Sequence, residues 1–350
     1  MDLDSKAIAI DVMGADRGPG EVIEGVKFAL KQDPQISSLT LVGIQSEIET
    51  HLKKCGIFGN PRLTISPASE IIGMDEKPTH GIKKKDSSMI RCLDLLKSQA
   101  CAAMVSCGNT GSLMAGATVK LRLMPGLERP ALSTVIPSKD HLFILLDVGA
   151  NPETTPKQLM HNAILGSNHC QIELGIQKPK IGLLTIGTEE GKGTERIQET
   201  HKYLKSLGHL INYIGLIEGY HVFEKDVDVV VCDGFVGNIL IKTCESLFHM
   251  LKELFKEELT ANPVRKLGAV LSMRAFKAIK HKFNPDRYSA APLLGVNGIV
   301  LKAHGSSNST GIMNAILTAQ KMLNQNMNKH ILCAVAEANQ IIKDKEGEPA

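Results

Sequence analysis

Short and almost continuous apolar runs recur along the chain, separated by stretches whose apolar positions follow helical spacing. Strands that are apolar throughout are typical of a parallel sheet covered by helices on both faces. The pattern therefore predicts an α/β protein with a doubly wound, largely parallel sheet. The runs expected to form strands are residues 7–11, 39–43, 101–106, 142–148, 181–186, 227–233 and 298–303.

Residues 243–283 depart from this alternation and predict a protruding amphipathic helical hairpin. Its first part places Leu247, Leu251 and Leu254 on one helical face. Its second part, residues 264–283, carries six Lys and Arg residues and no acidic residue. A basic amphipathic helix is typical of contact with a membrane surface or an acidic partner, and an apolar face also suits a dimer. The basic residues expected to make this contact are Arg265, Lys266, Arg274, Lys277 and Lys280.

The length of 350 residues allows two domains or one two-lobed unit. We expect a single two-lobed α/β unit over residues 1–340, which includes the hairpin, and a flexible tail at residues 343–350. The net charge of +3 identifies no partner, and the absence of Trp with only four Tyr argues against a nucleic-acid-binding surface. The eight Cys residues lack zinc-ligand spacing, and nothing else visible in the sequence requires a metal. We expect neither a metal nor a cofactor. No apolar run approaches the length of about 18 residues that spans a membrane, which favours a cytoplasmic location.

Small polar turns follow six of the predicted strands. In open α/β sheets, ligands bind outside the carboxyl ends of the strands. One turn rich in Gly, Asn and Ser would be ordinary, but six favour a shared crevice lined with hydrogen-bond donors. The turns are residues 13–20, 107–112, 149–156, 187–195, 233–238 and 304–309.

The turn GTEEGKG is close to a phosphate-binding Walker A loop but does not match one. That loop needs four residues between its glycines and a Ser or Thr after the Lys. Here three residues separate Gly187 from Gly191, and Gly193 follows Lys192. The mismatch argues against nucleoside triphosphate binding. Lys192 and Thr188 at a helix N-terminus still favour an anion site.

Two further turns carry candidate anion-binding groups. Asn109, Thr110 and Gly111 form a predicted tight turn into a helix of small residues, which suits either close approach of a ligand or simple packing. Lys85 and Ser87 precede another predicted helix, where they suit an anion site or an ordinary solvated helix cap.

Polar side chains at three other strand ends complete the candidate set. Lys302, His304 and Ser306 combine a cation, a titratable imidazole and a hydroxyl within one turn. Four more residues suit either the orientation of a ligand or the satisfaction of backbone groups at helix ends. They are Asp147, Asn151, Asp233 and Asn238.

Several functions remain compatible with these residues. An NAD-dependent dehydrogenase of the isocitrate-dehydrogenase-like fold would lack the G-x-G-x-x-G fingerprint, which is absent after the first strand. A phosphotransfer enzyme conflicts with the failed Walker motif. A non-catalytic membrane-associated scaffold would leave the polar turns unexplained. An acyltransferase that binds phosphate and accepts an acyl chain from an acidic carrier accounts for all of these features.

Seven motifs together resemble the bacterial phosphate acyltransferase family, PlsX. They span residues 8–307, and their joint occurrence is specific although each alone is weak. The motifs are IAIDVMGAD, KKKDSSM, SCGNTGSLMA, LLDVGAN, LLTIGTEEGKG, VVVCDGFVGN and KAHGSS.

The resemblance implies transfer of a long acyl group from acyl carrier protein to inorganic phosphate, giving acyl phosphate for phospholipid synthesis. It also implies an isocitrate-dehydrogenase-like fold, a homodimer, peripheral contact with an anionic membrane surface and handover to a membrane glycerol-3-phosphate acyltransferase. We expect Lys192, His304 and Asp233 to be catalytic, and Asp147, Asn151 and Asn238 to orient the other groups. The residues expected to bind phosphate or the oxyanion are Asn109, Thr110, Gly111, Thr188, Lys302, Ser306, Lys85 and Ser87.

The chain departs from the family pattern at three places. The family usually reads Gly-Gly-Asp-His-Ala-Pro after the first strand, where this chain has Ala15 in place of the second Gly and Arg17-Gly18 in place of His-Ala. Cys107 replaces the usual Ala before Gly108. Tyr220-His221 replaces Arg-Asp in a Glu-Gly-Arg-Asp motif of many members. Arg17 is cationic and can serve an anion, so we interpret these changes as tuning of the activity.

Overall fold

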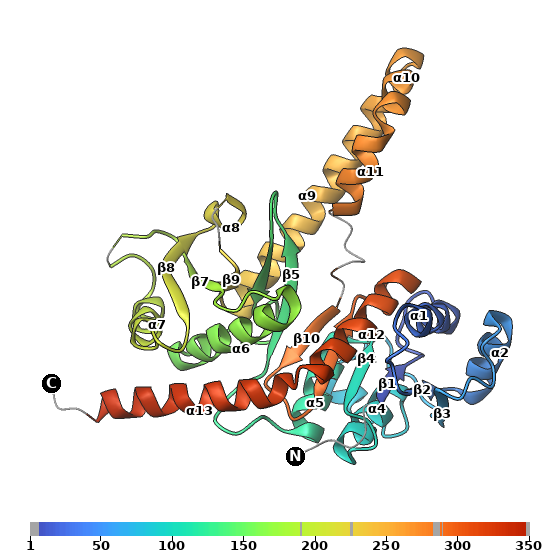
Figure 1. Ribbon diagram of the computed structural model, residues 1–350, viewed down its shortest axis with the longest axis horizontal. Helices are drawn as coiled ribbons and strands as arrows, with labels where there is room; N and C mark the ends of the chain where they lie inside the picture. Colours follow the sequence, from blue (N-terminus) through green and yellow to red (C-terminus); the bar gives the residue numbers. More distant parts are fainter. Residues whose placement is uncertain (1–6, 190, 225–226, 283–287, 289, 348–350) are drawn as a thin grey trace.

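The computed structural model describes residues 7–189, 191–224, 227–282, 288 and 290–347. Within these residues, two α/β lobes lie side by side and a helical arm projects away from both (Figure 1). Eleven strands form a mixed sheet in the order β3-β2-β1-β4-β11-β10-β5-β6-β9-β7-β8. The strands are β1 (Ile8–Asp11), β2 (Leu39–Gly43), β3 (Leu63–Pro67), β4 (Ala103–Ser106), β5 (Ala131–Pro137), β6 (Leu142–Leu146), β7 (Lys180–Thr185), β8 (Asn212–Glu218), β9 (Val229–Val231), β10 (Ala290–Leu294) and β11 (Ile299–Ala303).

The predicted fold class is confirmed, since most neighbouring strands are parallel and helices flank the sheet. Each of the seven apolar runs contains a strand. Four strands were not predicted. Of these, β3 and β8 lie at the two edges of the sheet and are partly exposed, so polar residues interrupt their apolar pattern.

The other two unpredicted strands, β5 and β10, join the lobes. β10 is antiparallel to both β11 and β5, and β5 is antiparallel to β6. Three successive antiparallel pairs reverse the strand direction, so the parallel strands of the first lobe run opposite to those of the second. The first lobe contains β1–β4 and β11, and the second contains β6–β9.

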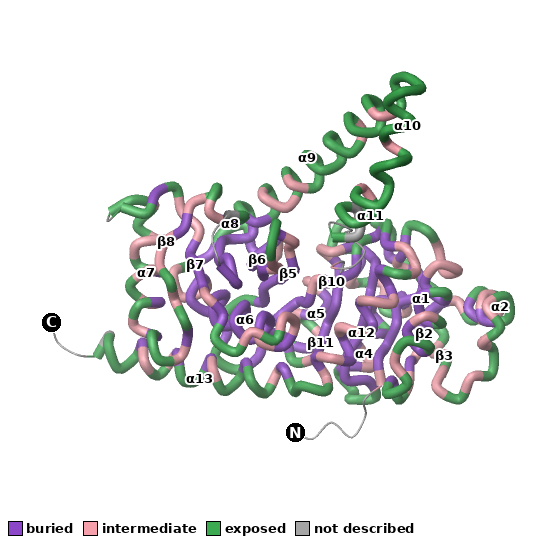
Figure 2. The backbone as a smooth tube through the Cα atoms, turned by 45° about the horizontal axis from the view of Figure 1, so that its top comes forward, coloured by how far each residue is buried: buried purple, intermediate pink, exposed green. Residues whose placement is uncertain are grey.

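Helices pack on both faces of this sheet, and their apolar residues form the core (Figure 2). The helix α6 is buried almost throughout, which explains how polar residues such as His161 and His169 come to lie in the interior. The helices of the lobes are α1 (Pro19–Gln32), α2 (Gln45–Cys55), α3 (Pro78–Gly81), α4 (Ser88–Lys97), α5 (Thr110–Leu121), α6 (Pro156–Leu174), α7 (Glu195–Ser206), α8 (His221–Glu224), α12 (Ser309–Asn324) and α13 (Met327–Glu346).

The arm consists of the distal part of α9 (Gly234–Thr260), together with α10 (Pro263–Leu271) and α11 (Met273–Lys282). The carboxylate of Asp233 caps the first turn of α9, which is anchored in the second lobe. Its 27 residues give α9 a length of about 40 Å at 1.5 Å per residue. The helix therefore continues without interruption from the body to the exposed arm, which covers the predicted hairpin region 243–283 up to Lys282.

The C-terminal helix α13 runs along the second lobe (Figure 1). It extends to Glu346, so its last turn overlaps the segment 343–350 that was expected to form a flexible tail. Among the described residues, no helix combines the length and apolar character needed to cross a lipid bilayer.

Candidate active site

A buried group at the ends of β1, β4 and β11 forms the first-lobe cluster, which consists of Asp11, Ser106 and Lys302 with the turns that follow them. The hydroxyl of Ser106 donates to Oδ2 of Asp11 at 2.6 Å, and the backbone N–H of Gly108 donates to Oγ of Ser106 at 3.0 Å. Lys302 Nζ donates to the carbonyl of Cys107 at 3.1 Å and also to that of Ala303. The cluster therefore fixes the three strand ends relative to one another.

The turns of the first lobe approach each other closely. A Cβ atom at Gly14 would lie 2.7 Å from both the backbone nitrogen of Gly108 and Oδ2 of Asp11, so only glycine fits there. The backbone N–H of Asp16 donates to the carbonyl of Gly305 at 2.9 Å. The turns 13–20, 107–112 and 304–309 are thus in direct contact.

Burial dominates the electrostatics of the first-lobe cluster. Burial raises the pKa of Asp11 and lowers the pKa of Lys302. The positive charge of Lys302 lowers the pKa of Asp11 in part, and the negative charge of Asp11 raises the pKa of Lys302 in part. The pKa of His304 is lowered, first because its ring is partly shielded from solvent and then because of the positive charges of Lys302 and Lys242. Since an ordinary histidine pKa is about 6.5, His304 is mainly neutral at pH 7. A neutral imidazole can accept a proton or a hydrogen bond there.

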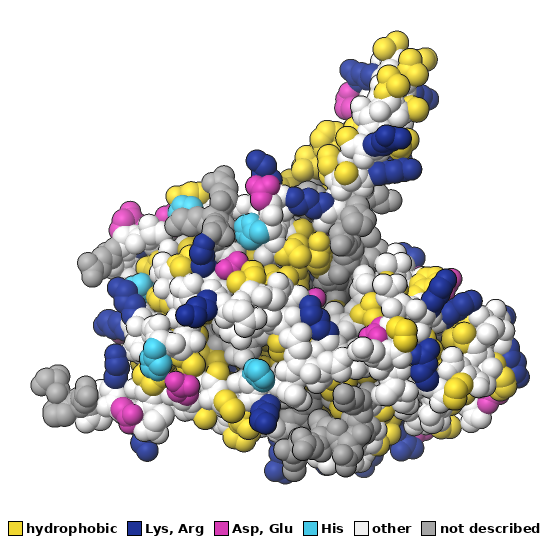
Figure 3. All heavy atoms as spheres, viewed as in Figure 1, with side chains coloured by type: hydrophobic (Ala, Val, Ile, Leu, Met, Phe, Trp, Pro, Cys, Tyr) yellow, Lys and Arg dark blue, Asp and Glu magenta, His cyan; other side chains and the backbone are white. Residues whose placement is uncertain are grey.

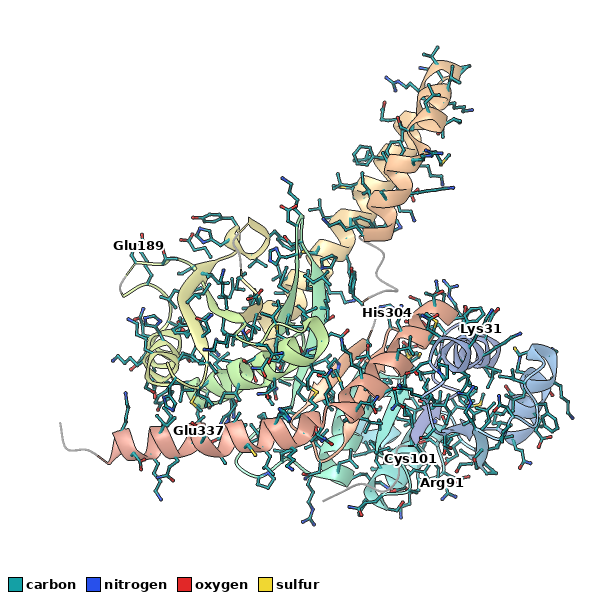
Figure 4. The ribbon with its side chains drawn as sticks, in the orientation of Figure 1. Lys31, Arg91, Cys101, Glu189, His304 and Glu337 are labelled. Atoms are coloured by element: carbon teal, nitrogen blue, oxygen red, sulfur yellow. The ribbon has the colours of Figure 1, made fainter. Side chains whose placement is uncertain are left out.

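His304 and Ser306 lie together as predicted, with Nδ1 of His304 2.8 Å from the hydroxyl of Ser306. His304 is exposed on the upper side of the first lobe (Figure 4). Lys302, two residues earlier, is buried. The imidazole of His304 and the hydroxyl of Ser306 are therefore available to a ligand, whereas the ammonium group of Lys302 lies beneath the surface.

Asn109 and its neighbours are occupied by contacts within the protein. Oδ1 of Asn109 accepts from the N–H of Ser112 and caps α5, while Nδ2 donates to the carbonyls of Met74 at 2.6 Å and Glu76 at 3.0 Å. Thr110 is the first residue of α5. A Cβ at Gly111 would lie 2.6 Å from Pro78, so this glycine permits close packing.

Lys85 and Ser87 differ in exposure. Lys85 is exposed, whereas Ser87 is buried, caps α4 and donates its hydroxyl proton to the carbonyl of Lys84 at 2.8 Å. Ser88, the next residue, faces Asp11. The N-terminus of α4 thus contacts the first-lobe cluster from below the turn that carries Lys85.

Asp147 and Asn151 in the second lobe stabilise the chain that surrounds them. Oδ1 of Asp147 accepts from three backbone N–H groups, those of Leu132, Gly149 and Ala150. Its Oδ2 accepts from the backbone N–H of Asn151 at 2.8 Å and from Nδ2 of Asn151 at 2.9 Å. Burial raises the pKa of Asp147, and these bonds oppose the rise. With all its lone pairs used, Asp147 holds the turn after β6.

Asp233 connects α9 with α7 through its two carboxylate oxygens. Oδ1 accepts from the backbone N–H of Val236 at 2.8 Å, and Oδ2 forms an ion pair of 2.6 Å with Nη2 of Arg196. Nη1 of Arg196 donates to the carbonyl of Thr154 at 3.2 Å. Asn238 is exposed one turn into α9 and lies against Gly149. We name Arg196, Asp233 and Asn238, with the turn that carries Lys192, the second-lobe cluster.

The turn that carries Lys192 projects from the second lobe, and Glu189 within it is labelled in Figure 4. Lys192 and Thr188 are exposed, and Thr194 caps the following helix α7. Gly191 and Gly193 have φ angles of 87° and 89°, in the left-handed region that glycine adopts without strain. The predicted strand, glycine turn and helix are therefore present, with the exposed Lys192 two residues before the cap Thr194.

Within the described part of the chain, the six polar turns fall into two groups, one in each lobe. The turns around residues 14, 108 and 305 belong to the first lobe, and those around residues 151, 188 and 234 to the second. The reversal of strand direction through β10 and β5 explains the division, because carboxyl ends share one edge only among parallel strands. The helix α9 links the groups, since Asp233 caps its first turn and its Lys242 is close enough to lower the pKa of His304.

Sequence reasoning missed three residues of these clusters and, beside them, Lys242. Asp11 and Ser106 are the last residues of two buried strands, and a polar residue at the end of an apolar run could have identified each as a site candidate. Lys242 and Arg196 are on helices, where an ordinary surface position explained their charge equally well. Only the fold brings Lys242 towards His304 and Arg196 to Asp233.

The arm carries both the predicted charges and an exposed apolar surface (Figure 3). Arg265, Lys266, Arg274 and Lys277 are exposed, and Arg265 forms an ion pair with Glu258. The side chain of Lys280 lies outside the described residues. The exposed large apolar residues of the arm are Leu247, Phe248, Met250, Leu251, Leu254, Phe255, Val264, Leu267, Val270, Leu271, Met273 and Ile279.

The residues at which the chain departs from the motif pattern occupy different environments. Gly18 has a φ of 80° at the N-cap of α1, which explains a glycine there, and Arg17 beside it is exposed. Ala15 and Cys107 are buried among the first-lobe turns. Tyr220 is exposed, with its ring centroid 3.8 Å from that of His221.

The fold places the chain in a class of two-lobed α/β proteins that includes acyl-transferring enzymes and dehydrogenases. It is similar to a phosphotransacetylase from Streptococcus pyogenes, with a TM-score of 0.63, 15% identity and coverage of 92% of this chain and 94% of that one. A Salmonella typhimurium protein described as a 4-hydroxythreonine-4-phosphate dehydrogenase gives a TM-score of 0.51 at 14% identity, covering 91% of this chain and 99% of that one. These likenesses confirm the dehydrogenase-like fold.

Sequence comparison identifies the family. The model of the family described as "Fatty acid synthesis protein" matches residues 6–330. A protein of Legionella pneumophila (strain Paris) named phosphate acyltransferase is 42% identical over 310 residues, which cover 88% of this chain and 90% of that protein. The chain belongs to the bacterial phosphate acyltransferase family, as its motifs predicted, and it is an acyltransferase. The dehydrogenase and scaffold alternatives are not retained.

Proposed function

We propose that this protein transfers a long-chain acyl group from acyl carrier protein to inorganic phosphate, forming acyl phosphate for phospholipid synthesis. A phosphate oxygen attacks the thioester carbonyl carbon, a C–O bond forms, and the C–S bond breaks. The electrons of that bond leave with the carrier thiolate, which takes a proton from solvent. A thiol has a pKa of about 8.5, so it departs without a strong acid.

The reaction requires stabilisation of negative charge more than activation of a nucleophile, because phosphate is already anionic. Positioning of two reactants can lower a barrier by roughly 7–11 kcal/mol, and one oxyanion donor by about 2.7–4 kcal/mol. The exposed Lys192 in a glycine-rich turn at the N-terminus of α7 is the observation that carries the proposal. The lysine charge, the backbone donors and the helix dipole all favour an anion there.

In this proposal Lys192 and Thr188 bind phosphate from the second lobe. His304 and Ser306 face the substrate from the first lobe, where a neutral His304 can accept a hydrogen bond. Lys302 stabilises the developing oxyanion from beneath the turn. The occupied side chains of Asn109 and Asp147 support the turns rather than the substrate.

The arm supports contact with an acidic carrier protein or an anionic membrane surface. Arg274 and Lys277 on α11 would attract either partner through long-range electrostatics. The exposed Leu254 and Phe255 on α9 suit insertion among lipids or burial against a second copy in a homodimer. A membrane location of the arm would allow handover of acyl phosphate to a membrane glycerol-3-phosphate acyltransferase.

The deciding experiment measures thiol release from palmitoyl-acyl carrier protein by the purified protein, with and without inorganic phosphate. Hydroxylamine traps acyl phosphate as a hydroxamate. We expect release that depends on phosphate, together with hydroxamate formation. Release that is the same without phosphate, or no release by folded protein, would contradict the proposed function.

A further inference from the structure

Arg196 lies at the point where three segments of the second lobe meet. It is the second residue of α7, directly after the turn that carries Lys192. Its guanidinium group donates to Oδ2 of Asp233 at 2.6 Å and to the carbonyl of Thr154 at 3.2 Å. These two hydrogen bonds join α7 to the turns after β6 and β9.

The geometry points to Arg196 as a positioning residue, which fixes the turn carrying Lys192 and Thr188 against the N-terminus of α9. This inference rests on the proposed role of that turn in phosphate binding. Arg196 lies outside the seven family motifs, and its guanidinium group is paired with Asp233 rather than facing a substrate. It acts through the groups that it holds.

The carboxylate of Asp233 contacts two helices at once, so its bond with Arg196 fixes the position of α7 relative to α9. One carboxylate oxygen caps α9, and the other binds Arg196, so the first turn of α9 and the start of α7 are held by a single side chain. Asn238 lies one turn into α9 from that cap, and Lys192 lies four residues before Arg196. The relative placement of Asn238 and Lys192 therefore depends on the Arg196–Asp233 pair.

The chemistry of arginine suits this role better than that of lysine. A planar guanidinium group binds two acceptors at once in fixed directions, whereas an ammonium group is a point charge on a flexible stem. Arg196 is about one-third exposed and Asp233 only 8% exposed, so the pair is shielded from solvent on one side. Loss of the arginine leaves the buried oxygen of Asp233 without its cation, which favours movement of the cap.

The test compares Arg196→Gln with Arg62→Gln as a matched control. Arg62 is also half-buried and donates to backbone carbonyls, those of Leu30 and Ile36, but it lies in the first lobe. Hydrogen exchange followed by mass spectrometry reports the mobility of residues 187–194 and 234–238 in each variant. Steady-state kinetics give KM separately for phosphate and for palmitoyl-acyl carrier protein.

We expect Arg196→Gln to accelerate exchange in both segments and to raise the KM for phosphate at least tenfold, with a smaller change in the KM for the acyl donor. Arg196→Lys should recover part of the phosphate KM, and Arg62→Gln should leave both exchange and phosphate KM unchanged. Wild-type exchange in both segments of Arg196→Gln, or equal increases in both KM values, would overturn the inference. An inactive wild-type protein would refute the proposed function, and exchange alone would then decide the positioning role.

Discussion

The hydroxyl of Ser106 lies 2.6 Å from Oδ2 of Asp11 and joins the ends of two neighbouring parallel strands. The same hydroxyl oxygen accepts the N–H of Gly108. We expect Ser106→Ala to destabilise the protein by about 1–3 kcal/mol, because a buried carboxylate and a buried N–H each lose a partner. Urea unfolding measures this change. Ser98→Ala, which removes an exposed hydroxyl, is the control, and equal effects of the two substitutions would contradict the prediction.

Lys192→Ala should lower turnover at least tenfold without lowering the melting temperature. The side chain is exposed, so its loss removes charge stabilisation but little packing. The thiol-release assay and circular dichroism measure the two quantities. Lys178→Ala, another exposed lysine of the second lobe, should retain full activity. A wild-type rate in Lys192→Ala would remove this lysine from the site.

Stability should fall in acid partly because of His169. Burial lowers its folded-state pKa to about 3, against about 6.5 in the unfolded chain. The folded protein thus holds the neutral form, so the contribution of His169 is complete above pH 6.5 and is lost as the pH falls towards 3. The slope is at most about 1.4 kcal/mol per pH unit.

His169→Gln keeps a hydrogen-bonding side chain near Ser133, which lies 2.7 Å from Nδ1 of His169, but cannot titrate. Its unfolding free energy should therefore depend less steeply on pH than that of the wild type between pH 6.5 and 4. Urea unfolding at several pH values gives both curves. Parallel curves for the two proteins would mean that His169 is not the group responsible.

Charge reversal on the arm distinguishes between its two proposed partners, acyl carrier protein and an anionic membrane. Arg274→Glu with Lys277→Glu should weaken binding of acyl carrier protein in solution if the arm meets the carrier, because carrier proteins are acidic. The same pair should reduce only sedimentation with anionic liposomes if the arm meets lipid. Reversal of two exposed lysines on α2, Lys53 and Lys54, controls for net charge. Unchanged binding to both partners would exclude these side chains from either contact.

The strands of the sheet were predictable where burial on both faces made them apolar, as in β1 and β9. The partly exposed edge strand β8 mixes polar and apolar positions and gave no such signal. The antiparallel strands β5 and β10 were missed as well. Without them, the reversal of strand direction between the lobes could not be foreseen.

The sequence could predict which residues lie near strand ends, but not which of them are exposed or which contact one another. Asp147 and His304 both follow apolar strands in the sequence and gave similar signals. In the structure Asp147 is buried and accepts five hydrogen bonds, whereas His304 faces solvent. The partner of a side chain depends on contacts between distant segments. For this reason the pair of Arg196 and Asp233 emerged only from the fold.

The continuity of α9 from Asp233 to Thr260 makes the arm sensitive to helical phase. With 3.6 residues per turn, insertion of one residue between Thr243 and Leu247 would rotate the remainder of α9 by about 100° relative to its first turn. Leu254 and Phe255 would then face a different direction, while the capped first turn stayed in place. Insertion of seven residues would nearly restore the phase and lengthen the arm by about 10 Å. An insertion in α9 that keeps the direction of these side chains must therefore be close to a whole number of turns.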